Sequence, residues 1–120
     1  FDKAIYYFSK TIELEPRDTL ANFYILICEG NKLFETGKKD NLWNAILKYN
    51  KAAQVNLKSG MPYFYIGLSY QKIGDKDFDL ILEAFQNALL LELSDKLRKE
   101  TQSQFEKTKK REQQLKDFWH

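Results

Sequence analysis

The sequence predicts an all-α fold in which antiparallel helix hairpins stack in a row, an α-solenoid, with a long capping helix at the C-terminus. Three observations support this prediction: one helical spacing occurs three times, glycines and prolines separate the copies, and the C-terminal part of the chain becomes strongly charged. The composition agrees, because 43% hydrophobic and 30% charged residues with only two prolines suit a helix-rich globular chain. At 120 residues, one structural unit is expected.

The recurring spacing combines a small or apolar residue, an aromatic residue and a second small residue. In the clearest copy, Ala45 is followed by Tyr49 and then by Ala52. Because these positions return to one face of a helix with 3.6 residues per turn, each copy predicts an amphipathic helix with an aromatic ring between small side chains. Small residues allow a neighbouring helix to approach closely. The copies, each with a leading apolar residue, are Phe1, Ala4, Phe8 and Thr11; Leu42, Ala45, Tyr49 and Ala52; and Phe78, Ile81, Phe85 and Ala88.

Two further helical runs lie between the copies, over residues 20–36 and 61–73. Each run is followed by a glycine, Gly37 or Gly74, which is predicted to end its helix in a left-handed conformation. Each run therefore begins a helix hairpin.

Proline and glycine mark the remaining boundaries. Pro16 is predicted to end the first helix. Ser59 and Gly60 break the chain before Met61, and Pro62 is tolerated there in a first helical turn. The predicted units are the second helix of an incomplete hairpin at 1–18, two complete hairpins at 19–58 and 59–93, and a capping helix at 94–120.

A resemblance to a known family is carried by the segments YYFSKTIELEP, CEGNKLFETGKK and PYFYIGLSYQKIG. The first segment resembles the end of a tetratricopeptide repeat (TPR), and the other two resemble the start of one. The resemblance covers residues 1–93 and implies a helical-repeat protein that binds other polypeptides. The matching positions in the two starts are Gly30, Leu33, Phe34 and Gly37, and Tyr63, Ile66, Gly67, Tyr70 and Gly74.

The copies depart from the regular TPR in their spacing. They recur after 41 and then 36 residues, whereas the regular repeat has about 34. The extra residues are expected to enlarge the turns at 38–41 and 76–77 and to add a helical turn near 19–22. Leu57 and Leu93 replace the terminal proline of the repeat, so those helices are expected to end less sharply.

From Ser94 onward the chain reads as a charged helix, which Ser94 or Asp95 is expected to cap. Residues 95–120 carry eight basic and five acidic side chains, a net charge of +3. A row of stacked hairpins leaves an apolar face at its end, and a polar terminal helix can cover that face. The sparse apolar stripe of this helix consists of Leu97, Thr101, Phe105, Thr108, Leu115 and Trp119.

The TPR resemblance implies a concave groove lined by the first helix of each hairpin. A groove with aromatic, apolar and a few polar side chains suits an extended or helical peptide. The alternative is that these side chains simply fill the core. The predicted groove residues are Tyr24, Ile27, Asn31, Phe34, Glu35, Met61, Phe64, Leu68, Gln71 and Lys72.

Some TPR co-chaperones hold a C-terminal carboxylate with paired lysine and asparagine side chains, and Asn31 matches one of those positions. Ile27 and Tyr65 stand where further donors are needed, so the sequence does not favour such a clamp.

Catalytic signals are absent from the sequence. His120 is the only histidine, and no Ser–His–acid set, metal-ligand spacing or glycine-rich phosphate loop occurs. The sequence therefore predicts neither an enzyme nor a cofactor or metal. Cys28 is the only cysteine, which excludes an internal disulfide, and a lone thiol is most often buried.

The predicted partner is another protein or peptide, with a structural or homo-oligomerising arm of a larger protein as the alternative. Phe118 and Trp119 are candidates for a second contact. The basic run at 107–111 is flanked by Glu106 and Glu112, which favours a solvated helix face, so nucleic acid is not expected. No apolar stretch approaches the roughly 18 residues of a membrane span.

Frequent lysine and asparagine are typical of an AT-rich bacterial genome. Phe1 opens within a helical pattern and no methionine precedes it, so further sequence is expected upstream. The compartment is not identified: the bacterial cytoplasm and, with an upstream signal or lipid anchor, the cell envelope or periplasm are both compatible.

Overall fold

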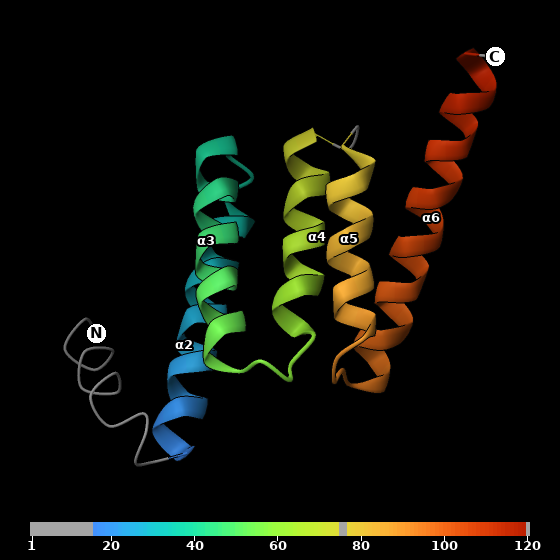
Figure 1. Ribbon diagram of the computed structural model, residues 1–120. Coiled ribbons are helices and arrows are strands. Elements are labelled where there is room, and N and C mark those ends of the chain that lie inside the picture. Colours follow the sequence, from blue (N-terminus) through green and yellow to red (C-terminus); the bar gives the residue numbers. More distant parts are fainter. Residues whose placement is uncertain (1–15, 75–76, 120) are drawn as a thin grey trace.

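The computed structural model describes residues 16–74 and 77–119 (Figure 1). These residues form helices and no strand, which confirms the predicted all-α class. The first copy of the recurring spacing, at residues 1–11, lies outside the described residues. The helices are α2 (Pro16–Glu35), α3 (Lys39–Val55), α4 (Met61–Gly74), α5 (Phe78–Leu89) and α6 (Asp95–Trp119).

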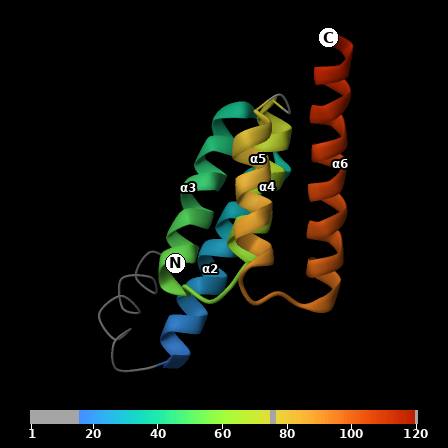
Figure 2. The ribbon, with the colours of Figure 1, turned by 45° about the vertical axis from the view of Figure 1, so that its right-hand side comes forward.

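Each helix packs against the next one along the chain, and consecutive helices run antiparallel (Figure 1). Both views place α2 and α3 at one edge of the molecule, α4 and α5 in the middle and α6 at the other edge (Figure 2). In addition, α6 contacts α4. The chain therefore forms a row in which α4 and α5 are covered on both sides.

The residues that recur in the sequence form the buried core. In α3 and α5, the aromatic ring of the spacing and its small or apolar companions have no exposed surface. Burying one such aromatic side chain stabilises the fold by roughly 1.5–3 kcal/mol. The fully buried residues are Ala45, Tyr49 and Ala52 in α3 and Ile81, Phe85 and Ala88 in α5.

Each of these aromatic rings lies directly against a glycine of the preceding helix. A Cβ atom added at Gly30 would lie 2.5 Å from Cε1 of Tyr49, and one added at Gly67 would lie 2.7 Å from Cδ1 of Phe85. Because these distances are too short for a side chain, glycine is what allows α3 to approach α2 and α5 to approach α4. Both glycines are among the matching positions of the two segments that resemble the start of a TPR.

The α3–α4 loop and the α5–α6 loop lie side by side. The backbone N–H of Gly60 donates to the carbonyl oxygen of Glu92 at 2.8 Å, and the N–H of Glu92 donates to the carbonyl oxygen of Lys58 at 2.8 Å. From α6, the guanidinium group of Arg98 donates to two carbonyl oxygens at the end of α5, at 2.9 Å each. These bonds hold the start of α6 against the end of α5.

Several predicted boundaries are confirmed. Gly37 has a φ of 70°, the left-handed conformation expected after α2. The chain breaks before Met61, and Pro62 lies in the first turn of α4. Ser94 caps α6, because its Oγ accepts a hydrogen bond from the backbone N–H of Leu97 at 3.2 Å.

Other predictions about the turns are wrong. Gly74 is the last residue of α4 and has no positive φ. Residues 39–41 form the first turn of α3 instead of an enlarged turn. The structure begins α2 at Pro16 rather than at Thr19, because proline fits the first turn of a helix and needs no hydrogen-bonded N–H there. The unit boundary placed after residue 18 therefore falls inside α2.

Two further differences concern single residues. The third copy was predicted to continue to Leu93, but α5 ends at Leu89 and the following residues enter the paired loops. Cys28 is exposed rather than buried, because it lies on the side of α2 away from the core.

Candidate functional site

The three helices that begin at the paired loops or beside them, α2, α4 and α6, form a continuous surface that we call the α2–α4–α6 face. Two side-chain contacts join its helices. Lys72 of α4 places its Nζ 4.1 Å from the ring centroid of Phe34 in α2. Gln71 of α4 donates from Nε2 to Oε1 of Gln104 and to Oγ1 of Thr108 in α6, at 3.3 Å each. The predicted groove residues lie on or under this face.

On α2, the predicted residues differ in their exposure. Tyr24 is 48% exposed, and Glu35 is also exposed. Phe34 and Asn31 are half-buried. Ile27 is 4% exposed and belongs to the core, so its prediction as a groove-lining residue does not match its position.

On α4, the predicted residues show the same division. Met61 and Leu68 are half-buried and Lys72 is exposed. Phe64 is only 4% exposed, because its ring packs against Phe85 of α5 at a centroid distance of 6.4 Å. Phe64, like Ile27, therefore fills the core instead of lining a groove.

Asn31 is held by the core rather than by a neighbouring lysine. The hydroxyl of Tyr49 donates to Oδ1 of Asn31 at 2.6 Å, and the Tyr49 ring stacks on Tyr65 at a centroid distance of 5.3 Å. Burial, together with the charges of Tyr65 and Glu35, raises the pKa of Tyr49 well above its ordinary value. The hydroxyl therefore remains a donor, and the carboxamide of Asn31 is fixed at the edge of the face.

A cleft of about 320 Å³ opens where the α2–α4–α6 face meets the two loops. Its apolar part comes from three helices and includes the predicted residues Tyr24 and Met61. Its polar part comes from the loops and was not predicted, because loop residues carry no helical periodicity. The lining consists of Phe23, Tyr24, Asn56, Ser59, Met61, Glu92, Leu93, Ser94 and Leu97.

The polar groups of the cleft have defined local partners. Asn56 Oδ1 accepts the backbone N–H of Lys58 at 3.1 Å, and Ser59 Oγ accepts the N–H of Met61 at 3.3 Å. The carboxylate of Glu92 is exposed and forms no ion pair with any residue in 16–74 or 77–119. Of these polar residues, the sequence singled out Ser59 as a chain break and Ser94 as a helix cap, but neither as part of a cleft.

The two residues predicted to make a second contact with a partner lie at the far end of α6. Phe118 and Trp119 are 77% and 78% exposed, and their rings meet edge to face at a centroid distance of 5.4 Å. Leu115 is also exposed, whereas Thr101 and Thr108 of the same stripe are buried. The apolar stripe of α6 is therefore covered in its first part and open at its end.

Among the described helices, none combines the length and the apolar character that a membrane span requires. Acidic, histidine and cysteine side chains in the described ranges do not gather into a group able to hold a metal ion. Comparison with known proteins finds no family model, no curated protein and no solved structure that matches this chain.

Proposed function

We propose that this chain is a non-catalytic adaptor or assembly scaffold that binds a partner polypeptide on the α2–α4–α6 face. The observation that carries the proposal is the cleft at the loop end of this face, where Tyr24, Met61 and Leu97 from three different helices line one cavity. A concave site with an aromatic side chain, apolar neighbours and a polar rim suits an extended or helical peptide.

We propose that the hairpins presenting this face form a TPR-like α-solenoid. Its support is the repeated packing of a ring on a glycine: Tyr49 on Gly30 in one hairpin and Phe85 on Gly67 in the next. The glycines are 37 residues apart and the rings 36 residues apart in the sequence. Near-equal spacing in two adjacent hairpins is typical of repeats that stack on their neighbours.

The residues of the cleft suggest how a partner polypeptide would be recognised. Tyr24 is rigid, amphipathic and half-exposed, which are properties of residues that dominate binding energy at interfaces. An apolar partner side chain would lie between Tyr24 and Met61, and partner N–H or ammonium groups would meet the carboxylate of Glu92. Lys72 would contact the partner further along the face.

The test is affinity capture with the complete native protein as bait, compared with a variant carrying Tyr24→Ala, Leu68→Ala and Lys72→Ala. These side chains are at least partly exposed, so the variant should keep its fold in circular dichroism. A matched control carries Leu90→Ala and Lys51→Ala, an exposed leucine and an exposed lysine on other surfaces. We expect the first variant to lose the partner and the control to retain it; a partner retained by both would place binding elsewhere.

The exposed end of α6 favours a second candidate function, a structural or oligomerising arm. Leu115, Phe118 and Trp119 form an apolar tip on an otherwise charged helix end. Light scattering over a range of protein concentrations tests it. A mass that rises with concentration in the native chain, but not after Phe118→Ser and Trp119→Ser, would support self-association; a constant monomer would argue against it.

A further inference from the structure

We propose that a second surface, the slot between α3 and α5, docks an arginine side chain from an extended basic segment of another protein. The slot runs over the side of α4 that faces away from the α2–α4–α6 face. It has a volume of about 190 Å³. Its lining residues are Asn50, Tyr63, Ile66, Tyr70, Leu80, Glu83, Ala84 and Asn87.

Large apolar side chains border the slot, and several of them are exposed. Leu80 of α5 is 37% exposed and Trp43 of α3 is 45% exposed. The ring of Trp43 meets that of Tyr70 edge to face, with centroids 6.0 Å apart. Leu47 lies one helical turn from both Trp43 and Asn50, on the same side of α3, and is 59% exposed. Four large side chains from three helices thus border one concave surface that other helices in the described ranges leave uncovered.

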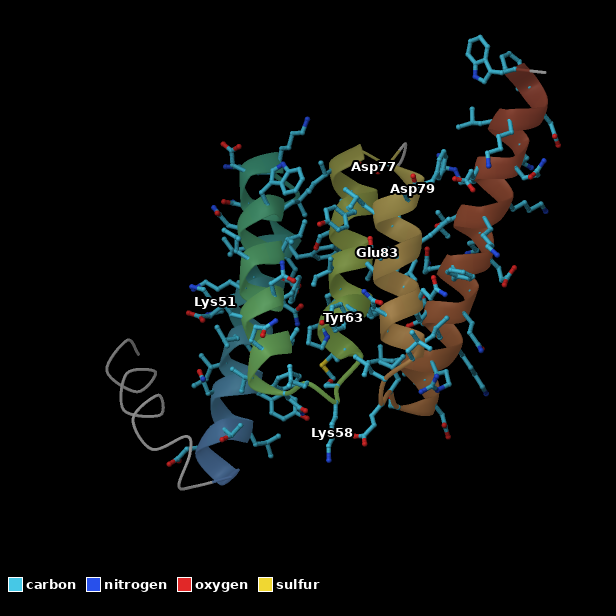
Figure 3. The ribbon with its side chains drawn as sticks, viewed as in Figure 1. Lys51, Lys58, Tyr63, Asp77, Asp79 and Glu83 are labelled. Carbon is cyan, nitrogen blue, oxygen red and sulfur yellow. The ribbon has the colours of Figure 1, made fainter. Side chains whose placement is uncertain are left out.

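The slot also carries negative charge. Glu83 of α5 lines it, and Figure 3 shows Glu83 and Tyr63 directed toward the space between α3 and α5. Asp77 lies at the upper end of α5 in the same view. Burial raises the pKa of Tyr70, and the charges of Asp77 and Glu83 raise it further, so both carboxylates act on the aromatic floor of the slot.

No cation within residues 16–74 and 77–119 forms an ion pair with these carboxylates. Lys51 lies on the opposite flank of α3, and Lys58 points away at the loop end (Figure 3). The slot therefore presents carboxylate charge beside aromatic rings without an internal counter-charge among the described side chains, and an anionic partner would be repelled from it.

A guanidinium group matches each of these features. It is planar and weakly hydrated, so it can stack on Tyr70 or Trp43 while its N–H groups meet the carboxylate of Glu83. Its remaining donors can reach the amide oxygens of Asn50 and Asn87, which lie on opposite walls. The aliphatic stem of the arginine would cover the apolar floor formed by Ile66 and Ala84.

The test uses the full chain carrying Trp119→Phe, so that Trp43 is the only tryptophan and reports on the slot. The probe is the peptide acetyl-Ala-Arg-Leu-Arg-Ala-amide, titrated to millimolar concentration. The control peptide has citrulline in place of arginine, which keeps the shape and removes the charge. We expect the arginine peptide to change Trp43 fluorescence and the citrulline peptide to bind about tenfold more weakly.

Two variants locate the effect. Glu83→Gln should weaken the arginine peptide about tenfold, because it removes the charged acceptor. Glu35→Gln, on the α2–α4–α6 face, should leave binding unchanged. Equal binding of the two peptides, no fluorescence change, or an unchanged affinity in Glu83→Gln would each overturn the proposal. None of these three outcomes bears on partner capture by the α2–α4–α6 face, since Glu83 lies outside that face.

Discussion

At the scale of single residues, the packing depends on the fit between one aromatic ring and one glycine in each hairpin. In an open helix, Gly67→Ala would stabilise by about 1 kcal/mol. Here the added methyl group would overlap the Phe85 ring, and overpacking costs about 1–3 kcal/mol. We therefore expect a net loss of unfolding free energy in urea titrations. Gly74→Ala is the control, because no other part of the described chain lies within 4 Å of its added Cβ; equal stability of the two variants would contradict the packing.

The buried ring itself provides a second prediction. Phe85 has no exposed surface, so Phe85→Ala should lower the free energy of unfolding by about 3–5 kcal/mol through lost burial and a residual cavity. Phe118→Ala removes the same atoms from a side chain that is 77% exposed and should change stability very little. Urea unfolding of both variants checks this. A wild-type midpoint for Phe85→Ala would show that α5 is packed in a different register.

Tyr49 makes stability sensitive to alkaline pH. Burial raises its pKa in the folded chain above the ordinary value of 10.0, so above that pH the unfolded chain releases a proton that the folded chain retains. The unfolded state then binds fewer protons, and stability falls as pH rises through and beyond pH 10.0. Tyr49→Phe should reduce this slope in urea titrations at pH 9, 10 and 11, values chosen to bracket the ordinary tyrosine pKa. An unchanged slope would assign the alkaline loss to other groups, Tyr70 first.

At the scale of helices, one side chain of α6 is hydrogen-bonded to the end of α5. Arg98 bridges the carbonyl oxygens of Leu89 and Leu91, and lysine cannot reproduce this fork. Arg98→Lys should therefore cost about 1–2 kcal/mol of unfolding free energy. The neighbouring Lys99→Met removes an exposed charge and serves as the control. If both variants melt like the native chain, the bridge does not hold α6 in place.

The helices could be predicted from the sequence because the core stripe has a helical period. Tyr49 and Phe85, each flanked by small or apolar residues, identified the buried faces of α3 and α5 correctly. The turns could not be predicted as well, since a longer repeat can be accommodated either in a loop or in an extra helical turn. Residues 39–41 form an extra helical turn, which lengthens α3 at its start.

The candidate sites were less accessible to sequence reasoning. Ile27 and Phe64 share the helical face of truly exposed residues, but contacts from neighbouring helices bury them, and those contacts are set by the packing. Trp43 and Leu47 did carry a signal: they are large apolar residues outside the core stripe of α3. The slot beside them forms only when α4 brings Tyr70 against Trp43 and α5 adds Glu83 to the lining.

At the scale of the whole molecule, the row of hairpins needs a cover at its α5 end. Leu97 and Phe105 of α6 pack against the cluster that contains Phe64 and Phe85, and Thr101 is fully buried there. Beyond Thr108, α6 has no buried residue up to Trp119. The two parts of one helix therefore have different roles.

Two truncations separate these roles. Ending the chain after residue 112 removes, among the described residues, only the exposed side chains of 113–119, so the melting temperature should remain close to that of the native chain. Ending it after residue 94 uncovers the Phe64 and Phe85 cluster, and the melting transition should become broad and shift downward as the apolar face binds a hydrophobic dye or another chain. Circular dichroism melts, dye binding and light scattering measure these effects. A sharp, native-like transition in the shorter chain would mean that α5 is stable without its cover, and α6 would then be present for binding rather than for folding.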